Sequence, residues 1–427
     1  MLTTLTRTIG AIVCMLSNVT GPSIYNEVEP TEATGSHQLV DESQLASPMA
    51  TVVGTGRKQP LTYTIAADNS VGTSCETSFP IVCTSVEENH AAHPTCNLCQ
   101  LPHAVMPTCN TMSDQACSKH RFWVVSSRRL TWNTCQADLE KPALSVSRLA
   151  CNGMTQPSSI NEYLQSIQPN RRVVFYVHGN RTSAPNATRY GLNFFQRVHS
   201  QLDDRPTDWV IFSWPSAQAG YLLKDAREKA FRTDAQGLYL AWLVRNHVQQ
   251  SSSIAMVGYS FGARVVSGSL HALGGGSLGN RSLNEPYFHG ADISAGLVAA
   301  AFDADWMQPN RYHGYTTKNL RTLTLLYNHR DVALRNHWRL SRERSSEALG
   351  FSGPRRFGLR VDGTRLPVKA LNCTASVRAR HAERFYYDRA CSAGRQMANL
   401  INNSRPPCQL QLKTPSHDAI CETSLVP

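Results

Sequence analysis

The chain has 427 residues, enough for two or three domains or for one large α/β domain with extensions. Its formal net charge of +11 is unevenly distributed. Residues 1–118 hold three basic and ten acidic side chains, and the rest of the chain holds 39 basic and 21 acidic ones. No zinc-finger spacing or arginine–aromatic ladder indicates a nucleic-acid partner. No stretch has the 18 or so uninterrupted apolar residues that would predict a transmembrane helix.

Residues 1–20 have features of a secretory signal. Arg7 supplies a positive start and "IGAIVCMLSNVTG" a short apolar core, although no clean cleavage site follows. Residues 21–118 are rich in Thr, Ser, Pro and Ala and show neither a helical nor a strand period, which predicts a low-order segment without its own core. We expect export, with a cytoplasmic location as the alternative.

Thirteen cysteines are many for a cytosolic protein of this size. Six of them fall within about forty residues, a density typical of disulfides in an oxidising compartment. These six are Cys75, Cys83, Cys96, Cys99, Cys109 and Cys117. The alternative is zinc, held by His93, Cys96, Cys99 and His103. Only one CxxC pair is present there, so we expect no metal site.

Strand candidates alternate with helical spacing from residue 121 onward. The apolar, β-rich runs are "RFWVVSSRRL" (121–130), "RRVVFYVHGN" (171–180), "DWVIFSWP" (208–215), "IAMVGYS" (254–260), "AGLVAAAFDAD" (295–305), "LRTLTLLYNHRD" (320–331) and a last one near 368–377. Helical spacing covers 221–249, about 261–273 and 387–402. This alternation predicts an α/β fold, with a mostly parallel sheet covered by helices on both faces. We expect the domain to span 119–405, followed by a tail at 406–427.

One serine stands between two glycines where a predicted strand becomes a predicted helix, in Gly258-Tyr259-Ser260-Phe261-Gly262. A very tight turn there would lift the serine out of the sheet, and a Cβ two residues away on either side would clash. The following helix would aim free backbone N–H groups and its positive dipole end at the same point. GxSxG alone is a weak signal, but with this strand and helix around it the pattern predicts a nucleophile.

An earlier strand, "VVFYVHGN", ends in His178-Gly179-Asn180, two strand–helix steps upstream of the serine. With the GxSxG turn, this arrangement resembles the α/β-hydrolase superfamily, in which an H-G-x turn offers the N–H of the residue after glycine to an oxyanion. The resemblance implies an oxyanion hole made by the backbone N–H groups of Asn180 and Phe261. It also implies that His178 is structural and not a catalytic base.

The chain is most similar to a group of uncharacterised bacterial α/β-hydrolases. The shared motifs are "YVHGN", "FSWPS" (212–216), the GxSxG turn, "AAFDAD" (300–305) and "NHRDVAL" (328–334), and the similarity spans roughly residues 120–400. The group more usually has a motif such as H-S-M-G around the serine. Tyr259 and Phe261 are therefore departures from its pattern, and they leave the mechanism unaltered.

The superfamily order of nucleophile, acid and then histidine points to candidates for the other two members of a triad. Asp331 follows the strand candidate at 320–331, where the family usually has its acid, and Asp303 and Asp305 are the alternatives after the preceding strand. Among the later histidines, His337 is too close to Asp331 in the chain to reach across, and His417 lies in a proline-flanked tail. His381, between the last strand and the last helix, is the expected base.

These residues predict a serine hydrolase of the carboxylesterase type, acting on a small acyl ester through an acyl-enzyme and needing no cofactor. An acyltransferase with the same triad, or a binding or scaffold domain, are the alternatives. Eight arginines between Asp331 and His381 would either favour an anionic substrate or form a solvated basic surface. They are Arg335, Arg339, Arg342, Arg344, Arg355, Arg356, Arg360 and Arg365. The sequence does not indicate an oligomeric state.

Overall fold

The computed structural model describes residues 119–150, 154–220, 222–340, 346–389, 392–408 and 410–413. The predicted signal, the Cys-rich region with its zinc alternative, and His417 lie outside these residues. No helix within the described ranges has both the length and the apolar character to cross a membrane.

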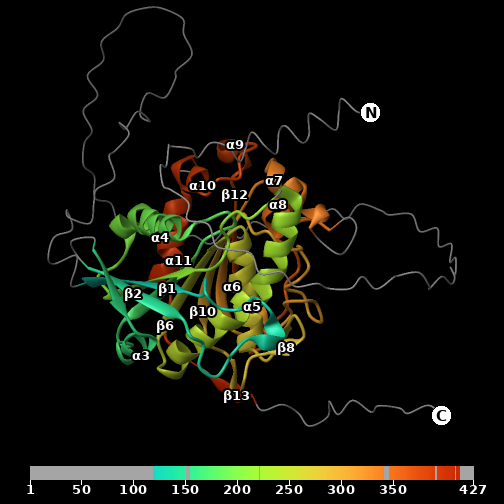
Figure 1. Ribbon diagram of the computed structural model, residues 1–427. Helices are drawn as coiled ribbons and strands as arrows, with labels where there is room; N and C mark the ends of the chain where they lie inside the picture. Colours follow the sequence, from blue (N-terminus) through green and yellow to red (C-terminus); the bar gives the residue numbers. More distant parts are fainter. Residues whose placement is uncertain are drawn as a thin grey trace, which may run out of the picture. The chain divides into compact units, whose positions relative to one another are not determined.

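The fold is built on a nine-stranded sheet in the order β12-β11-β10-β6-β4-β5-β1-β2-β3 (Figure 1). The strands are β1 (His120–Ser126), β2 (Ser145–Leu149), β3 (Thr155–Ser158), β4 (Arg172–Val177), β5 (Thr207–Ser213), β6 (Ser253–Tyr259), β10 (Ile293–Val298), β11 (Leu320–Tyr327) and β12 (Val368–Asn372). All neighbours from β12 to β1 pair in parallel, and β2 and β3 add an antiparallel edge. The predicted α/β class with a mostly parallel sheet is confirmed.

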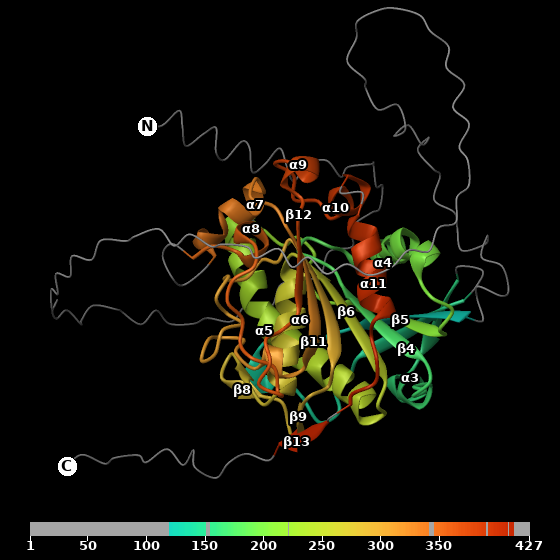
Figure 2. The same cartoon turned by 180° about the vertical axis from the view of Figure 1, so that it is seen from behind.

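Helices cover both faces of the sheet, as Figures 1 and 2 show from opposite sides. The long helices α5 (Leu222–Gln249) and α6 (Phe261–Leu273) pack together on one face, and α4 (Ala184–Val198) and α11 (Ala393–Asn402) lie on the other. The side chains of β4 and β5 are buried along their whole length. Such near-continuous apolar strands are expected where a parallel sheet is covered on both faces.

The remaining elements are short. They are α3 (Ile160–Gln165), α7 (Val332–Arg335), α8 (Leu349–Ser352), α9 (Thr374–Val377), α10 (Arg384–Arg389), the 3₁₀ turns η3 (Thr134–Gln136), η4 (His199–Gln201), η5 (Thr316–Lys318) and η6 (His337–Arg339), and the small pairs β7 (Ser277–Leu278) with β8 (Arg281–Ser282) and β9 (Tyr287–His289) with β13 (Gln411–Lys413).

Element boundaries differ from the sequence prediction in three places. The last strand stops at Asn372, and the rest of the predicted strand is α9. The last predicted helix is two helices, α10 and α11. Three residues of the predicted tail form β13, which pairs with β9. The pairing of β13 with β9 joins residues far apart in the chain, which local spacing cannot indicate.

The strand order reverses at β4. The chain runs from β4 to β5 on one side, then crosses back to β6 on the other side and continues through β10, β11 and β12. In open α/β sheets the crevice at the carboxyl ends of the strands beside such a reversal is where ligands bind. The H-G-N turn follows β4 and Ser260 follows β6, so both lie at this crevice.

Candidate active site

Ser260 occupies the turn between β6 and α6 with an unusual backbone. Its φ of 54° and ψ of −117° lie in a region that residues with a side chain rarely adopt. A Cβ at Gly258 would stand 2.6 Å from the carbonyl oxygen of Gly262. A Cβ at Gly262 would stand 2.1 Å from the carbonyl oxygen of Val177, at the end of β4. Glycine at both positions therefore permits the tight turn and brings the start of α6 against β4.

The H-G-N turn is held by the FSWPS segment that follows β5. The indole of Trp214 stacks on the His178 ring with centroids 5.6 Å apart, and its Nε1 donates to the His178 carbonyl at 2.8 Å. The backbone N–H of Trp214 donates to His178 Nε2 at 3.2 Å, and Ser216 Oγ donates to the Gly179 carbonyl at 3.1 Å. Burial lowers the pKa of His178 to about 3, so the ring is neutral and structural.

Two backbone donors follow these turns. Among the described residues, nothing accepts a hydrogen bond from the N–H of Asn180 or of Phe261. Asn180 comes directly after the locked H-G-N turn, and Phe261 is the first residue of α6, whose opening N–H groups have no intrahelical partner. Because Gly262 lies against the Val177 and His178 carbonyls, the two donors belong to adjacent backbone segments.

Ser260, His381 and Asp331 form one chain of hydrogen bonds. Ser260 Oγ lies 2.9 Å from His381 Nε2, and His381 Nδ1 lies 2.8 Å from Asp331 Oδ2. The serine comes from the turn after β6, the aspartate from the end of β11, and the histidine from the segment between α9 and α10. The structure thus brings together the three residues that the sequence singled out, from positions up to 121 residues apart.

Asp331 is fully buried and its carboxylate is held by three donors. The N–H of Leu334 donates to Oδ1 at 3.0 Å, so Asp331 also caps α7. Tyr386 donates its hydroxyl to Oδ2 at 3.1 Å, beside the bond from His381. A buried carboxylate with all these bonds is fixed in one orientation, which in turn fixes the imidazole.

The two alternative acids have other partners. Asp303 Oδ1 lies 2.7 Å from His337 Nε2, and both side chains are buried. Asp305 Oδ2 lies 3.1 Å from Arg311 Nε on the surface. His381 contacts Asp331 and neither of these carboxylates.

Tyr259, which departs from the motif of the hydrolases that the sequence resembles, contacts the histidine. Its hydroxyl donates to the carbonyl oxygen of His381, and the two rings lie 5.4 Å apart. Two residues on, the Glu383 carboxylate accepts from Tyr176 at 2.7 Å and from Tyr387 at 3.4 Å. Burial raises the pKa of Glu383 to about 7. Sequence reasoning missed these contacts, and the departure at Tyr259 was the one signal that could have indicated them.

Two arginines of the 335–365 segment already have acidic partners. Arg355 pairs with Glu347 at 2.6 Å, and Arg360 pairs with Asp292 at 3.1 Å and with Asp362 at 2.9 Å. Arg342 and Arg344 lie outside the described residues. Within the described part of the chain, no three His, Cys, Asp or Glu side chains gather in a way that could hold a metal ion.

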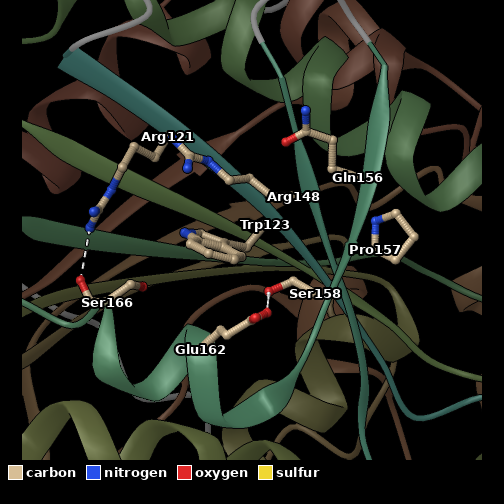
Figure 3. A pocket seen from close by; sticks show the side chains of 8 residues that line it. All are labelled: Arg121, Trp123, Arg148, Gln156, Pro157, Ser158, Glu162 and Ser166. Carbon is tan, nitrogen blue, oxygen red and sulfur yellow. Dashed lines mark hydrogen bonds between the residues drawn. The ribbon is translucent and has the colours of Figure 1, made fainter.

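A pocket of about 330 Å³ lies elsewhere, against the antiparallel edge formed by β1, β2, β3 and α3 (Figure 3). Arg121, on one side of it, is bonded to the Ser166 carbonyl and paired with Asp208, and Glu162 caps α3. Its lining includes Trp123, Arg148 and Gln156 and shares no residue with the Ser260 site.

Two solved structures are remotely similar to the chain. No protein-family model matches the chain, and no curated protein has a similar sequence. Among solved structures, an uncharacterized protein from Bacillus cereus ATCC 10987 is 13% identical over 51% of this chain and 56% of its own, with a TM-score of 0.25. TT1662 from Thermus thermophilus is 10% identical over 62% of this chain and 95% of its own, with a TM-score of 0.31. At these TM-scores neither likeness bears on activity.

Proposed function

We propose that the protein is a serine hydrolase of the α/β-hydrolase type that cleaves an acyl ester. The observation that carries the proposal is the hydrogen-bonded chain from Ser260 Oγ through His381 to the buried Asp331. A nucleophile, a base within reach of it and a group that orients the base are the parts that acyl transfer to serine requires.

Each residue has a distinct role in the proposed reaction. His381 Nε2 takes the proton of Ser260 as Oγ attacks the ester carbonyl. Asp331 accepts a hydrogen bond from His381 Nδ1, so it selects the tautomer whose Nε2 is free to act as a base and it stabilises the imidazolium. The imidazolium then protonates the departing alcohol. Water attacks the acyl-enzyme by the same route, with His381 again as the base.

The oxyanion formed during both steps needs donors. The N–H groups of Asn180 and Phe261 are proposed for this role, because neither donates to another described residue and both follow rigid turns. A donor fixed before the reaction has no reorganisation cost, and losing one such donor typically costs about 3 kcal/mol. The two hydrogen bonds between Trp214 and His178 would keep the N–H group of Asn180 in place.

The first test is labelling of the full-length protein with a fluorophosphonate, an electrophile that is attacked by an activated serine. We expect labelling in the wild type and none in Ser260→Ala or His381→Ala. A panel of acyl esters of increasing chain length would then define the substrate. Absence of labelling in a well-folded wild-type protein would contradict the proposal and favour a binding domain. Product analysis with an added alcohol or amine acceptor separates hydrolysis from acyl transfer.

A further inference from the structure

Four large apolar side chains are exposed around the first half of α5. Trp132 is 49% exposed, Leu223 38%, Phe231 52% and Trp338 50%. Single exposed apolar residues are normal, but several gathered on one surface indicate an interaction site. Trp132 and Trp338 are two of the seven tryptophans in the chain.

Hydrogen-bond and cation–π contacts join these residues into one surface. Leu223 and Phe231 lie on the exposed stripe of α5, with the exposed Arg227 midway between them. Arg227 Nε donates to the carbonyl of Arg339 at 3.0 Å, which brings Trp338 beside α5. The guanidinium of Arg232 lies over the ring of Trp132, 5.4 Å from its centroid. Figures 1 and 2 both show the N-terminal end of α5 beside α7 and α8.

The charged side chains among these residues are mostly basic. Asp225 and Lys229 are buried against each other, 2.5 Å apart, and do not contribute to the surface. Glu228, the one acidic residue that remains, is paired with Arg232. The other basic residues of the surface are Lys224, Arg227 and Arg339. These three and the four apolar residues are called the aromatic–basic surface below.

One end of the aromatic–basic surface, at the start of α5 and at Trp338, lies at the same edge of the sheet as Ser260, because α5 follows β5 and Trp338 follows β11. Trp132 lies further along α5, next to Thr131, whose carbonyl accepts from Tyr239. Strands β5 and β11 run parallel to β6, whose carboxyl end carries Ser260. Trp338 is adjacent to His337, whose partner Asp303 follows β10 at that edge.

We propose that the aromatic–basic surface docks the protein on an anionic lipid bilayer. Tryptophan and phenylalanine favour the headgroup region, and nearby Lys and Arg are attracted to anionic headgroups. Residues after position 118 carry more basic than acidic side chains, and this positive charge adds a long-range attraction to an anionic bilayer. Self-association of a second copy through this surface would bring like charges together. The end of this surface nearest Ser260 would then lie against the membrane, whether or not the proposed hydrolysis takes place.

The test is co-sedimentation of the full-length protein with vesicles of phosphatidylcholine alone and of phosphatidylcholine mixed with phosphatidylglycerol. The protein should carry Ser260→Ala, so that binding is measured without hydrolysis and failure of the proposed activity does not affect the result. We expect binding to the mixed vesicles that weakens as salt rises. We also expect quenching of tryptophan fluorescence by lipids brominated in the acyl chain.

Two double variants test the basic and the apolar residues of the surface separately. Lys224→Glu with Arg227→Glu should weaken binding by about tenfold or more, because each basic residue near an anionic bilayer contributes about a factor of five. Phe231→Ala with Trp338→Ala should weaken binding and reduce the quenching. The matched controls are Lys369→Glu with Lys413→Glu, and Leu412→Ala, all exposed on β12 and β13 away from this surface.

Equal binding by the surface variants and the controls would overturn the proposal, as would failure of the folded protein to bind either kind of vesicle. Concentration-dependent self-association that Trp338→Ala abolishes, without vesicle binding, would identify the surface as an interface between copies and would also overturn it.

Discussion

Two aspartate–histidine pairs lie at the same edge of the sheet, and only one of them touches a nucleophile. Asp303 and Asp331 follow the neighbouring strands β10 and β11, and each lies within 2.8 Å of an imidazole nitrogen. His337 uses Nε2 to contact Asp303, and the ring is only 2% exposed. His381 uses Nδ1 to contact Asp331, which leaves Nε2 for Ser260, and its side chain is 24% exposed.

This difference shows what an Asp–His pair needs in order to act on a substrate. The carboxylate must bind one ring nitrogen while the other faces a nucleophile in a place that a substrate can reach. The Asp331–His381 pair meets both conditions. The Asp303–His337 pair meets neither, and its hydrogen bond joins the loop after β10 to η6 as a structural contact.

The largest expected effect comes from removing either end of the hydrogen-bonded chain. Ser260→Ala and His381→Ala should each lower kcat by about 10⁴-fold or more with little change in KM, since both remove the attacking group or its base. Ester hydrolysis and circular dichroism should be measured on the same preparations. Retained activity in a folded Ser260→Ala variant would show that another residue is the nucleophile.

The two pairs can be compared directly by substituting their acids. Asp331→Asn should lower kcat by about 10³- to 10⁴-fold, because the amide favours the wrong imidazole tautomer. Asp303→Asn is the matched control, and it should leave kcat within about tenfold while lowering stability by about 1–3 kcal/mol through loss of a buried hydrogen bond. Steady-state kinetics and thermal unfolding measure these effects. The opposite result, with Asp303→Asn inactive and Asp331→Asn active, would reverse the assignment of the acid.

Buried histidines with a structural role should make the protein sensitive to acid. Burial lowers the pKa of His178 to about 3, and of His120, His247 and His271 to about 4. Below about pH 6.5 the unfolded chain binds more protons than the folded one, so stability present above that pH is lost as pH falls. We expect a loss on the order of several kcal/mol between pH 6.5 and pH 5. Thermal unfolding across this range tests it, and an unchanged Tm would contradict it.

A smaller effect concerns Glu383, close to His381 in the chain. Its folded pKa, raised to about 7, exceeds the ordinary value of 4.5. Between these values the folded state binds more protons, so the contribution of Glu383 destabilises the fold as pH rises from about 4.5 to 7. Glu383→Gln removes this ionisation and should raise the stability at pH 8 relative to wild type by on the order of 2 kcal/mol.

The control for this prediction is the same pair of proteins at pH 4.5. Wild type and Glu383→Gln should there differ little, because the carboxyl group is protonated in the folded state. An equal difference at both pH values would mean that the amide alters packing or hydrogen bonding rather than removing a charge.

Local sequence was enough to predict the features that depend on neighbouring residues. The GxSxG turn, the H-G-N turn and the strands around them are set by adjacent glycines and apolar runs. The choice between Asp303 and Asp331 could not be decided in this way, since both follow strands and differ only in which imidazole reaches them. The contact from Tyr259 to the His381 carbonyl joins residues 122 positions apart, and spacing cannot predict it.

The backbone at Ser260 has a consequence for the evolution of the fold. A residue with a side chain at positive φ costs about 1–3 kcal/mol, and the rest of the sheet must supply that stability. A glycine at position 260 would remove the strain together with the hydroxyl. Selection for stability alone would therefore favour glycine at this position, and a strained serine there is what the proposed role as nucleophile requires.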